Sequence, residues 1–97
     1  MPTYIYTTYD AAVNPVNCCA HMEVYNSSNV QTLHLKRFAN ANTFVNHEGL
    51  WYFISYDPAK AENKRCCVWT TSTEPDANGN LRIIKDRVLC CGDRVAL

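Results

Sequence analysis

Glycine is scarce in this chain, with only three residues among 97, at positions 49, 79 and 92. A loop that cradles phosphate groups needs several closely spaced glycines, so their scarcity argues against a nucleotide-binding enzyme. Net charge is also absent, because nine Lys and Arg residues balance nine Asp and Glu residues. A neutral chain does not attract nucleic acid or anionic membranes over long range, so the charge balance argues against a nucleic-acid partner.

Long apolar runs are missing as well. The longest, Leu50–Ile54, has the length of a strand, whereas about 18 apolar residues are needed to cross a bilayer. The first residues contain no basic segment followed by an apolar one, which predicts no secretory signal. We therefore expect a cytoplasmic protein with no membrane partner.

The length and composition predict one packed unit. A chain of 97 residues suits a single domain spanning 1–97. An apolar share of 47% is ordinary for a globular protein and too high for a disordered one. The oligomeric state is left open by these features.

Six cysteines occur as three adjacent pairs, at 18–19, 66–67 and 90–91. Neighbouring side chains on a strand point to opposite faces, so an adjacent pair does not readily give both sulfurs to one zinc ion. Without a secretory signal, we expect buried free thiols, with disulfides and metal ligands as alternatives. The sequence therefore predicts no metal site and no cofactor.

Strand-favouring residues dominate most of the chain. Thr, Tyr, Ile, Val and Trp are concentrated in segments that predict strands, and polar clusters between these segments predict two hairpin loops, at 26–29 and 74–80. The predicted strands are 3–9, 20–25, 30–38, 50–56, 66–73 and 81–89. Residues 16–25 and 81–91 also fit helical spacing, so a helix stays open for both segments.

Three segments predict short helical structure. A turn is expected near 14–18, a helix over 39–48 capped by Gly49, and one or two helical turns over 59–64. Together with the strands, they predict an α+β fold: a five- or six-stranded, mostly antiparallel sheet with one or two short helices packed on one face.

Two details of this arrangement can be checked in a structure. The strand at 50–56 is apolar on both faces, which predicts a central position with Trp51 and Phe53 buried. A hairpin centred on residues 77–79 would bring the pair at 66–67 close to the pair at 90–91.

Catalytic patterns are weak. His21, His34 and His47 are the candidate bases for a Cys–His site, but no family signature surrounds them. The carboxylates are scattered, and no spacing forces two of them into one cleft. We expect no catalytic residues and a protein that is not an enzyme, with a small Cys–His enzyme or a zinc- or thiol-dependent cysteine cluster as alternatives.

A binding role is the remaining expectation. Tyr4 and Tyr6 on the first strand, and the basic pairs Lys36–Arg37 and Lys64–Arg65, are the candidate partner-binding residues. A short, neutral chain without motifs is typical of phage or mobile-element proteins that block a host complex, anti-CRISPR proteins among them. We therefore expect a small non-catalytic inhibitor that acts by protein–protein contact.

Overall fold

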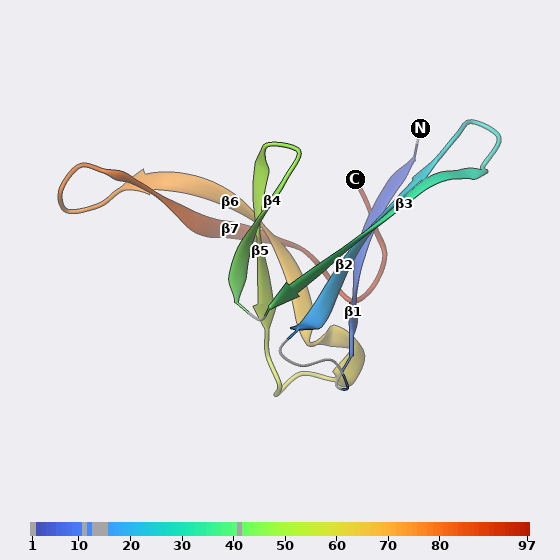
Figure 1. Cartoon of the computed structure of the whole chain (residues 1–97), viewed down its shortest axis with the longest axis horizontal. Coiled ribbons are helices and arrows are strands. Elements are labelled where there is room, and N and C mark those ends of the chain that lie inside the picture. Colours follow the sequence, from blue (N-terminus) through green and yellow to red (C-terminus); the bar gives the residue numbers. More distant parts are fainter. Residues whose placement is uncertain (1, 11, 13–15, 41) are drawn as a thin grey trace.

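The structure is a computed structural model that describes residues 2–10, 12, 16–40 and 42–97, except for the side chains of residues 16 and 17. The described residues form two four-stranded antiparallel sheets that pack against each other (Figure 1). The elements are β1 (Thr3–Tyr9), β2 (Val16–Tyr25), β3 (Gln31–Asn40), β4 (Thr43–His47), β5 (Leu50–Tyr56), η1 (Glu62–Lys64), β6 (Cys66–Pro75), β7 (Leu81–Cys91) and β8 (Val95–Ala96).

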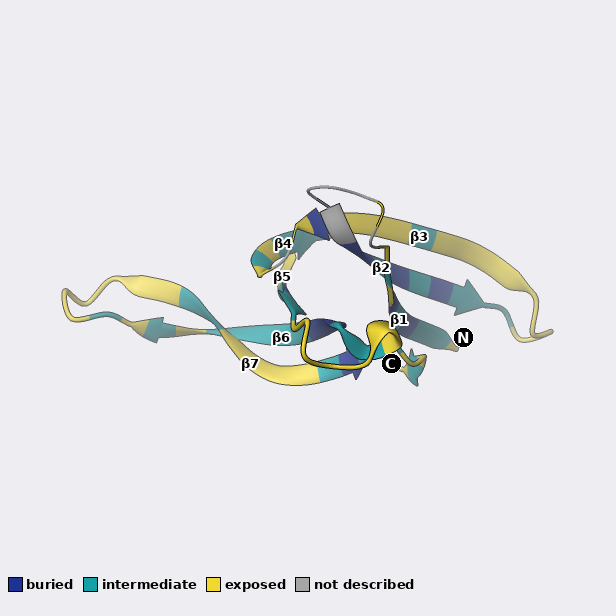
Figure 2. Ribbon diagram, turned by 90° about the horizontal axis from the view of Figure 1, so that it is seen from below, coloured by how far each residue is buried: buried dark blue, intermediate teal, exposed yellow. Residues whose placement is uncertain are grey.

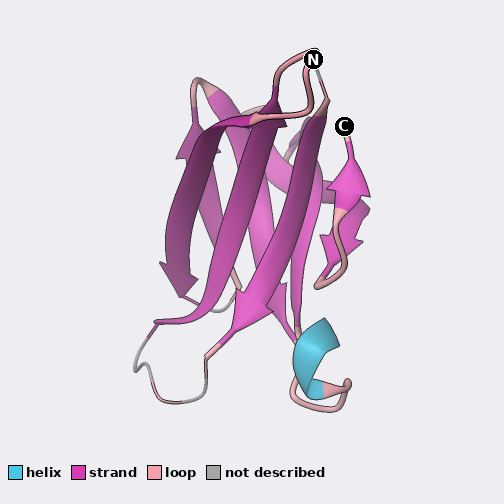
Figure 3. Cartoon of the chain, turned by 90° about the vertical axis from the view of Figure 1, so that its right-hand side faces the viewer, coloured by secondary structure: helices cyan, strands magenta, loops and turns pink. Residues whose placement is uncertain are grey.

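The chain builds one sheet and then the other. The first sheet has the strand order β3-β2-β1-β8 and the second has β4-β5-β6-β7. After β7, the chain returns to the first sheet, where Leu97 donates its backbone N–H to the carbonyl of Thr3 at 2.8 Å. The first and last strands, β1 and β8, therefore lie side by side in the same sheet (Figure 3).

The predicted α+β fold is wrong. Within the described ranges, the only helical segment is the one-turn 3₁₀ helix η1, which replaces the turns predicted for 59–64. The predicted helix at 39–48 is instead the end of β3 followed by β4, and Val16–Cys18 belongs to β2. The part of the predicted turn at 14–15 lies outside the described residues.

A tight turn explains why 39–48 is not a helix. Glu48 and Gly49 both have positive φ, +51° and +82°, as a two-residue hairpin turn requires. This turn pairs β4 with β5, so that Phe44 lies opposite Phe53. Gly49 has the backbone freedom that suits a helix cap, but it uses that freedom in a hairpin.

Both predicted hairpins are present, and their loops are built alike. In the β2–β3 loop, Asn26 Oδ1 accepts the backbone N–H groups of Ser28 and Val30. In the β6–β7 loop, Asp76 Oδ1 accepts those of Asn78 and Asn80. These Asx turns close the two loops, and the segments that also fitted a helix, 16–25 and 81–91, lie in strands.

The core lies where the two sheets cross, and it is small. Most of the buried residues gather there, whereas β3 and most of β7 are exposed (Figure 2). The core cluster consists of Ile5, Cys18, Ala39, Ile54, Cys66, Val68 and Cys90. Covalent cross-links between strands add to the stability that burial in this core provides.

Two disulfides supply those cross-links. Cys18–Cys66 joins β2 of the first sheet to β6 of the second, and Cys67–Cys91 joins directly opposed residues of β6 and β7. The expectation of free thiols is therefore wrong for these four cysteines, while Cys19 and Cys90 are free and buried. The predicted proximity of 66–67 to 90–91 is confirmed.

A hydrogen-bonded threonine also connects the sheets. The buried Thr7 of β1 donates its hydroxyl to the Cys66 carbonyl at 2.6 Å and accepts the Gly92 N–H at 2.8 Å. Gly92 has φ +87°, and a Cβ there would overlap the carbonyl oxygen of Asn63. The chain can therefore pass from β7 back towards β8 only with glycine at this position.

Candidate functional site

The outer face of the first sheet carries a continuous group of polar and aromatic side chains. Alternation along β1, β2 and β3 places them on one surface, because residues two apart in a strand share a face. We call this surface the tyrosine–histidine face; it consists of Tyr4, Tyr6, His21, Glu23, Tyr25 and His34.

Glu23 is the centre of this face. Its carboxylate accepts hydrogen bonds from the hydroxyls of Tyr6 and Tyr25, both at 2.8 Å, and from Arg94 at 3.1 Å. The hydrogen bond from Tyr25, followed by that from Tyr6, holds the pKa of Glu23 below its usual value. Desolvation, followed by the hydrogen bond to Glu23, raises the pKa of Tyr6 to about 12. The carboxylate is thus ionised and the phenol neutral at physiological pH.

The two histidines extend this network. His21 Nε2 lies 2.8 Å from Thr8 Oγ1, and His21 Nδ1 lies 3.1 Å from His34 Nε2. The Tyr6 ring stacks on the His21 ring at 4.5 Å between centroids. Desolvation, followed by the proximity of His34, lowers the pKa of His21, so its ring stays neutral at physiological pH. The network satisfies its own hydrogen-bonding groups, as buried structural polar groups do.

The two free thiols lack the activation that a nucleophilic cysteine needs. Burial raises the pKa of the Cys19 thiol, and burial raises that of Cys90 to about 11. Since the thiolate is the reacting form, both groups are poor nucleophiles at neutral pH, which argues against the Cys–His alternative. Within the described ranges, no group of three or more His, Cys, Asp and Glu side chains is placed to hold a metal ion.

The structure brings together three of the six candidate binding residues. Tyr4 and Tyr6 lie on the tyrosine–histidine face, with the Arg94 guanidinium 4.5 Å from the centre of the Tyr4 ring. Lys36 lies opposite His21 on the same face. Arg37 is the next residue along β3, so it lies on the inner side, where it donates to the Asn46 carbonyl at 3.0 Å.

The last two candidates lie near the 3₁₀ helix. Lys64 forms an ion pair with Asp93. Arg65 donates its Nε–H to the Lys60 carbonyl at 3.2 Å and lies 5.3 Å from the centre of the Tyr9 ring. These contacts connect η1 to the rest of the fold, so both residues have structural partners.

Sequence reasoning missed a second surface, on the outer face of the second sheet. The strand register places Phe44, Phe53, Trp69 and Val88 in one row across β4, β5, β6 and β7. Trp51 lies beside this row, two residues before Phe53 on the same strand. We call this set of five side chains the aromatic face.

The aromatic face is substantially exposed to solvent. The exposed fractions are 41% for Phe44, 44% for Trp51 and 48% for Val88. The predicted burial of Trp51 is therefore wrong, and Phe53 is only half-buried. The reason is the pleat of β5: Ile54 points into the core, so its neighbours in sequence point outwards.

A lysine lies within this aromatic surface. Lys85 Nζ is 4.6 Å from the centre of the Trp69 ring and 5.6 Å from that of Phe53. Trp69 also donates its Nε1–H to Ser55 at 2.9 Å, which fixes the indole in position. Recognition of the β4–β5 turn in the sequence could have placed Phe44 beside Phe53 on one face of the sheet, because the turn sets the register of the two strands. It could not have shown that this face points away from the core.

Comparison with known proteins identifies no relative: no family model, no curated protein and no solved structure matches this chain. Among the described residues, no helix is long and apolar enough to span a lipid bilayer. The fold and the two outer faces are therefore the basis for any functional conclusion.

Proposed function

We propose that the protein is a small non-catalytic binding protein that contacts a protein partner through the aromatic face. The observation that carries this proposal is the row of Phe44, Phe53, Trp69 and Val88, with Trp51 beside it, on a sheet whose opposite side already forms the core. Phe44, Trp51 and Val88 are exposed, and Phe53 and Trp69 are half-buried. Large apolar side chains gathered on one exposed face are typical of interaction sites, whereas single exposed ones are ordinary.

The residue types support a protein partner. Tryptophan is enriched among the residues that contribute most to binding energy, because it covers much area and has few rotatable bonds. Trp51 and Trp69 are both present, and Trp69 is held in place by Ser55. Lys85 adds one positive charge within the apolar surface, which favours a partner with an apolar pocket bordered by a carboxylate.

The β6–β7 hairpin extends the same surface. Beyond Thr70, this hairpin projects from the body as a ribbon (Figure 1). Its outer side carries Leu81, 72% exposed, and the half-buried Ile83, in line with Lys85. A two-stranded ribbon gains little stability by itself, so burial of these side chains against a partner would stabilise it.

The partner of this protein would be a complex of a host cell. The short length, the zero net charge and the absence of a catalytic motif in the sequence support an inhibitor of a host complex, of the phage or mobile-element type that includes anti-CRISPR proteins. Its mechanism would be to cover a working surface of that complex.

The test uses matched exposed aromatic residues on the two sheets. The protein is immobilised, its partner is captured from a host lysate and purified, and the affinity is measured for Trp51→Ala and for the control Phe38→Ala. Phe38 is 65% exposed on the outer face of the first sheet, opposite Cys19. We expect Trp51→Ala to weaken binding about tenfold or more and Phe38→Ala to leave it unchanged.

Two outcomes would contradict the proposal. Equal affinity of Trp51→Ala and wild type would exclude the aromatic face as the binding surface. Tight binding of single-stranded oligonucleotides that depends on Trp51 would instead indicate a nucleic-acid stacking surface, because bases also stack on exposed aromatic rings.

A further inference from the structure

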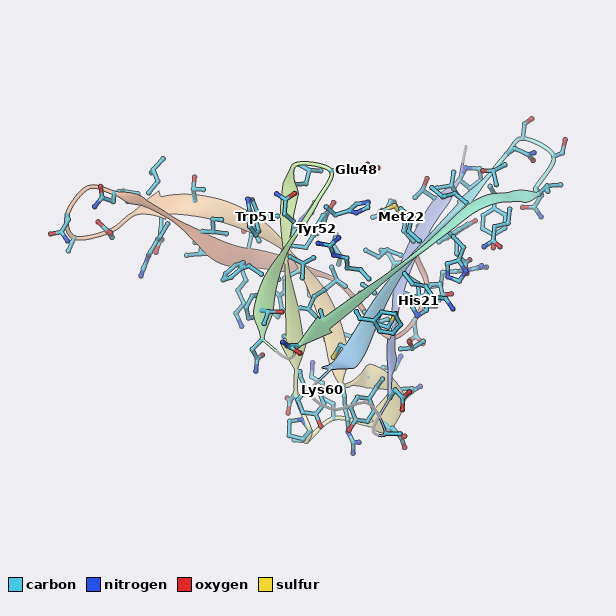
Figure 4. All side chains as sticks on the ribbon, viewed as in Figure 1. His21, Met22, Glu48, Trp51, Tyr52 and Lys60 are labelled. Carbon is cyan, nitrogen blue, oxygen red and sulfur yellow. A yellow bond between two sulfur atoms is a disulfide. The ribbon has the colours of Figure 1, made fainter. Side chains whose placement is uncertain are left out.

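A cavity of about 160 Å³ lies between the two sheets, beside the core. Its walls come from the inner faces of both sheets, and it is bordered by β3 and β4, the edge strands of each. Figure 4 shows Met22 and Tyr52 on the two sides of the space between the sheets. The cavity and the aromatic face therefore lie on opposite sides of the second sheet.

The walls of the cavity are predominantly apolar. Ile5, Ala20, Met22, Leu35, Val45 and Ile54 belong to the lining, together with Val68 and Tyr52. A cavity of about 150 Å³ with similar side chains holds a benzene molecule in another protein, so this one has room for a single ring. The lining therefore favours a ligand whose main part is an apolar ring.

Five residues of the lining carry side-chain groups that can donate hydrogen bonds, namely His21, Lys36, Arg37, His47 and Tyr52. Arg37 and His47 lie on the two edge strands, β3 and β4. Arg37 uses one Nη2 hydrogen bond for the Asn46 carbonyl, and a guanidinium has five N–H donors in all. The Nε2 atom of His47 is buried and has no hydrogen-bond partner among the described residues. Its nearest carboxylate oxygen, on Glu48, is 4.0 Å away and belongs to a side chain that is 80% exposed.

The N–H donors of Arg37 and His47 suit a carboxylate group. A carboxylate can accept two parallel N–H bonds from a guanidinium, and such pairs are stronger than neutral hydrogen bonds. His47 supplies a further donor when its proton lies on Nε2, and a buried nitrogen without a partner is costly to leave unpaired. An anion would therefore satisfy the polar groups that the cavity contains.

We propose that this cavity binds a small carboxylic acid with an apolar body about the size of a benzene ring. The ring lies between Met22 and Leu35 of the first sheet and Val45 and Tyr52 of the second. The carboxylate pairs with Arg37 and His47 at the β3–β4 side. This site is independent of the proposed function, because no residue of the aromatic face takes part in it.

The test compares benzoate with benzyl alcohol, which has a similar ring but no charge, by NMR titration of the full chain. We expect saturable benzoate binding below about 10 mM, and affinity for benzyl alcohol about tenfold weaker. Arg37→Gln should weaken benzoate about tenfold while leaving benzyl alcohol unchanged. Arg87→Gln, which removes an exposed arginine from β7, is the matched control and should change neither affinity.

A second variant keeps the test decisive if Arg37→Gln does not fold. Arg37→Lys retains the charge but not the paired donors, so benzoate should weaken measurably while the fold is preserved. Val45→Phe, which fills the cavity, should abolish binding of both probes. Benzoate shifts that do not saturate, or that are the same in Arg37→Lys and Val45→Phe as in wild type, would overturn the proposal. Loss of partner binding in Trp51→Ala would leave these titrations unchanged.

Discussion

The outer faces of the two sheets differ in the side chains that they present to solvent. Each sheet buries one side against the other, and its second side must face water or a partner. On the first sheet, Glu23, its two tyrosines and Arg94 form a hydrogen-bonded network that is complete without any partner. On the second sheet, Trp51 and Phe44 are exposed, Phe53 and Trp69 are half-buried, and the four rings make few polar contacts of this kind.

This difference shows which face is available for recognition. Displacing the network around Glu23 would break charge-assisted hydrogen bonds, so binding there would carry a cost. Covering the aromatic face removes apolar area from water and breaks no such network. The sequence predicted Tyr6 as a binding residue, but in the structure the Tyr6 hydroxyl is hydrogen-bonded to Glu23, whereas Trp51 is exposed and can contact a partner.

The largest expected effect tests how the two sheets are held together. Cys18→Ser removes the disulfide between them, and the two cysteines are 48 residues apart in sequence. Loss of this cross-link should lower the free energy of unfolding by about 4 kcal/mol, because the unfolded chain regains loop entropy. Urea unfolding measures the change. Cys19→Ser, the adjacent free thiol, is the control and should cost much less; equal losses would show that the disulfide contributes nothing.

The next comparison uses two residues on opposite faces of β5. Ile54 is 2% exposed and lies in the core, so Ile54→Ala should lower the free energy of unfolding by about 3 kcal/mol through cavity formation. Trp51→Ala should cost less than about 1 kcal/mol, because nearly half of the indole is exposed. Chemical denaturation of both variants measures the difference. A Trp51→Ala loss as large as that of Ile54→Ala would mean that the aromatic face is part of the core.

Alkaline pH should weaken the hydrogen-bonded network on the first sheet. The pKa of Tyr6 is raised from its ordinary 10.0 to about 12, so between these values the unfolded chain loses this proton before the folded one. The contribution of Tyr6 to the free energy of unfolding is fully present below pH 10 and falls as the pH rises towards 12. Tyr6→Phe should flatten that part of the curve of unfolding free energy against pH. An unchanged slope in Tyr6→Phe would place the alkaline sensitivity elsewhere.

Acidic pH should lower the free energy of unfolding by the smallest amount of these four changes. This effect, too, arises from the network around Glu23 on the first sheet. The pKa of Glu23 is lower in the folded protein than in the unfolded chain. The contribution of Glu23 to the free energy of unfolding is therefore fully present above the ordinary carboxyl pKa, and it is lost as the pH falls through the pKa of the folded protein. Glu23→Gln should remove this dependence, which a series of unfolding curves at acidic pH would measure. Glu48→Gln changes a largely exposed carboxylate and serves as the control. Identical acid sensitivity in both variants and wild type would contradict the role of the network.

Local sequence determined the two long hairpins. Polar loops at 26–29 and 76–80 carry the Asn and Asp residues that close Asx turns, and β-favouring residues flank them. The strand at 50–56 was also predictable, since a short apolar run bounded by turn residues favours a strand. These features depend on contacts between residues close in sequence, so a local pattern is enough to predict them.

Only the tertiary structure decided how these strands divide into two sheets and which side of each is buried. Strand periodicity shows that Trp51 and Ile54 point in opposite directions, but not which direction leads to the core. The same holds at β3, where Arg37 faces the cavity and Lys36 the outer surface. The pairing of Cys18 with Cys66 likewise depends on β2 crossing β6, a contact between distant segments. The inward side of a strand is set by the sheet that packs against it, and that sheet is made of residues far away in the chain.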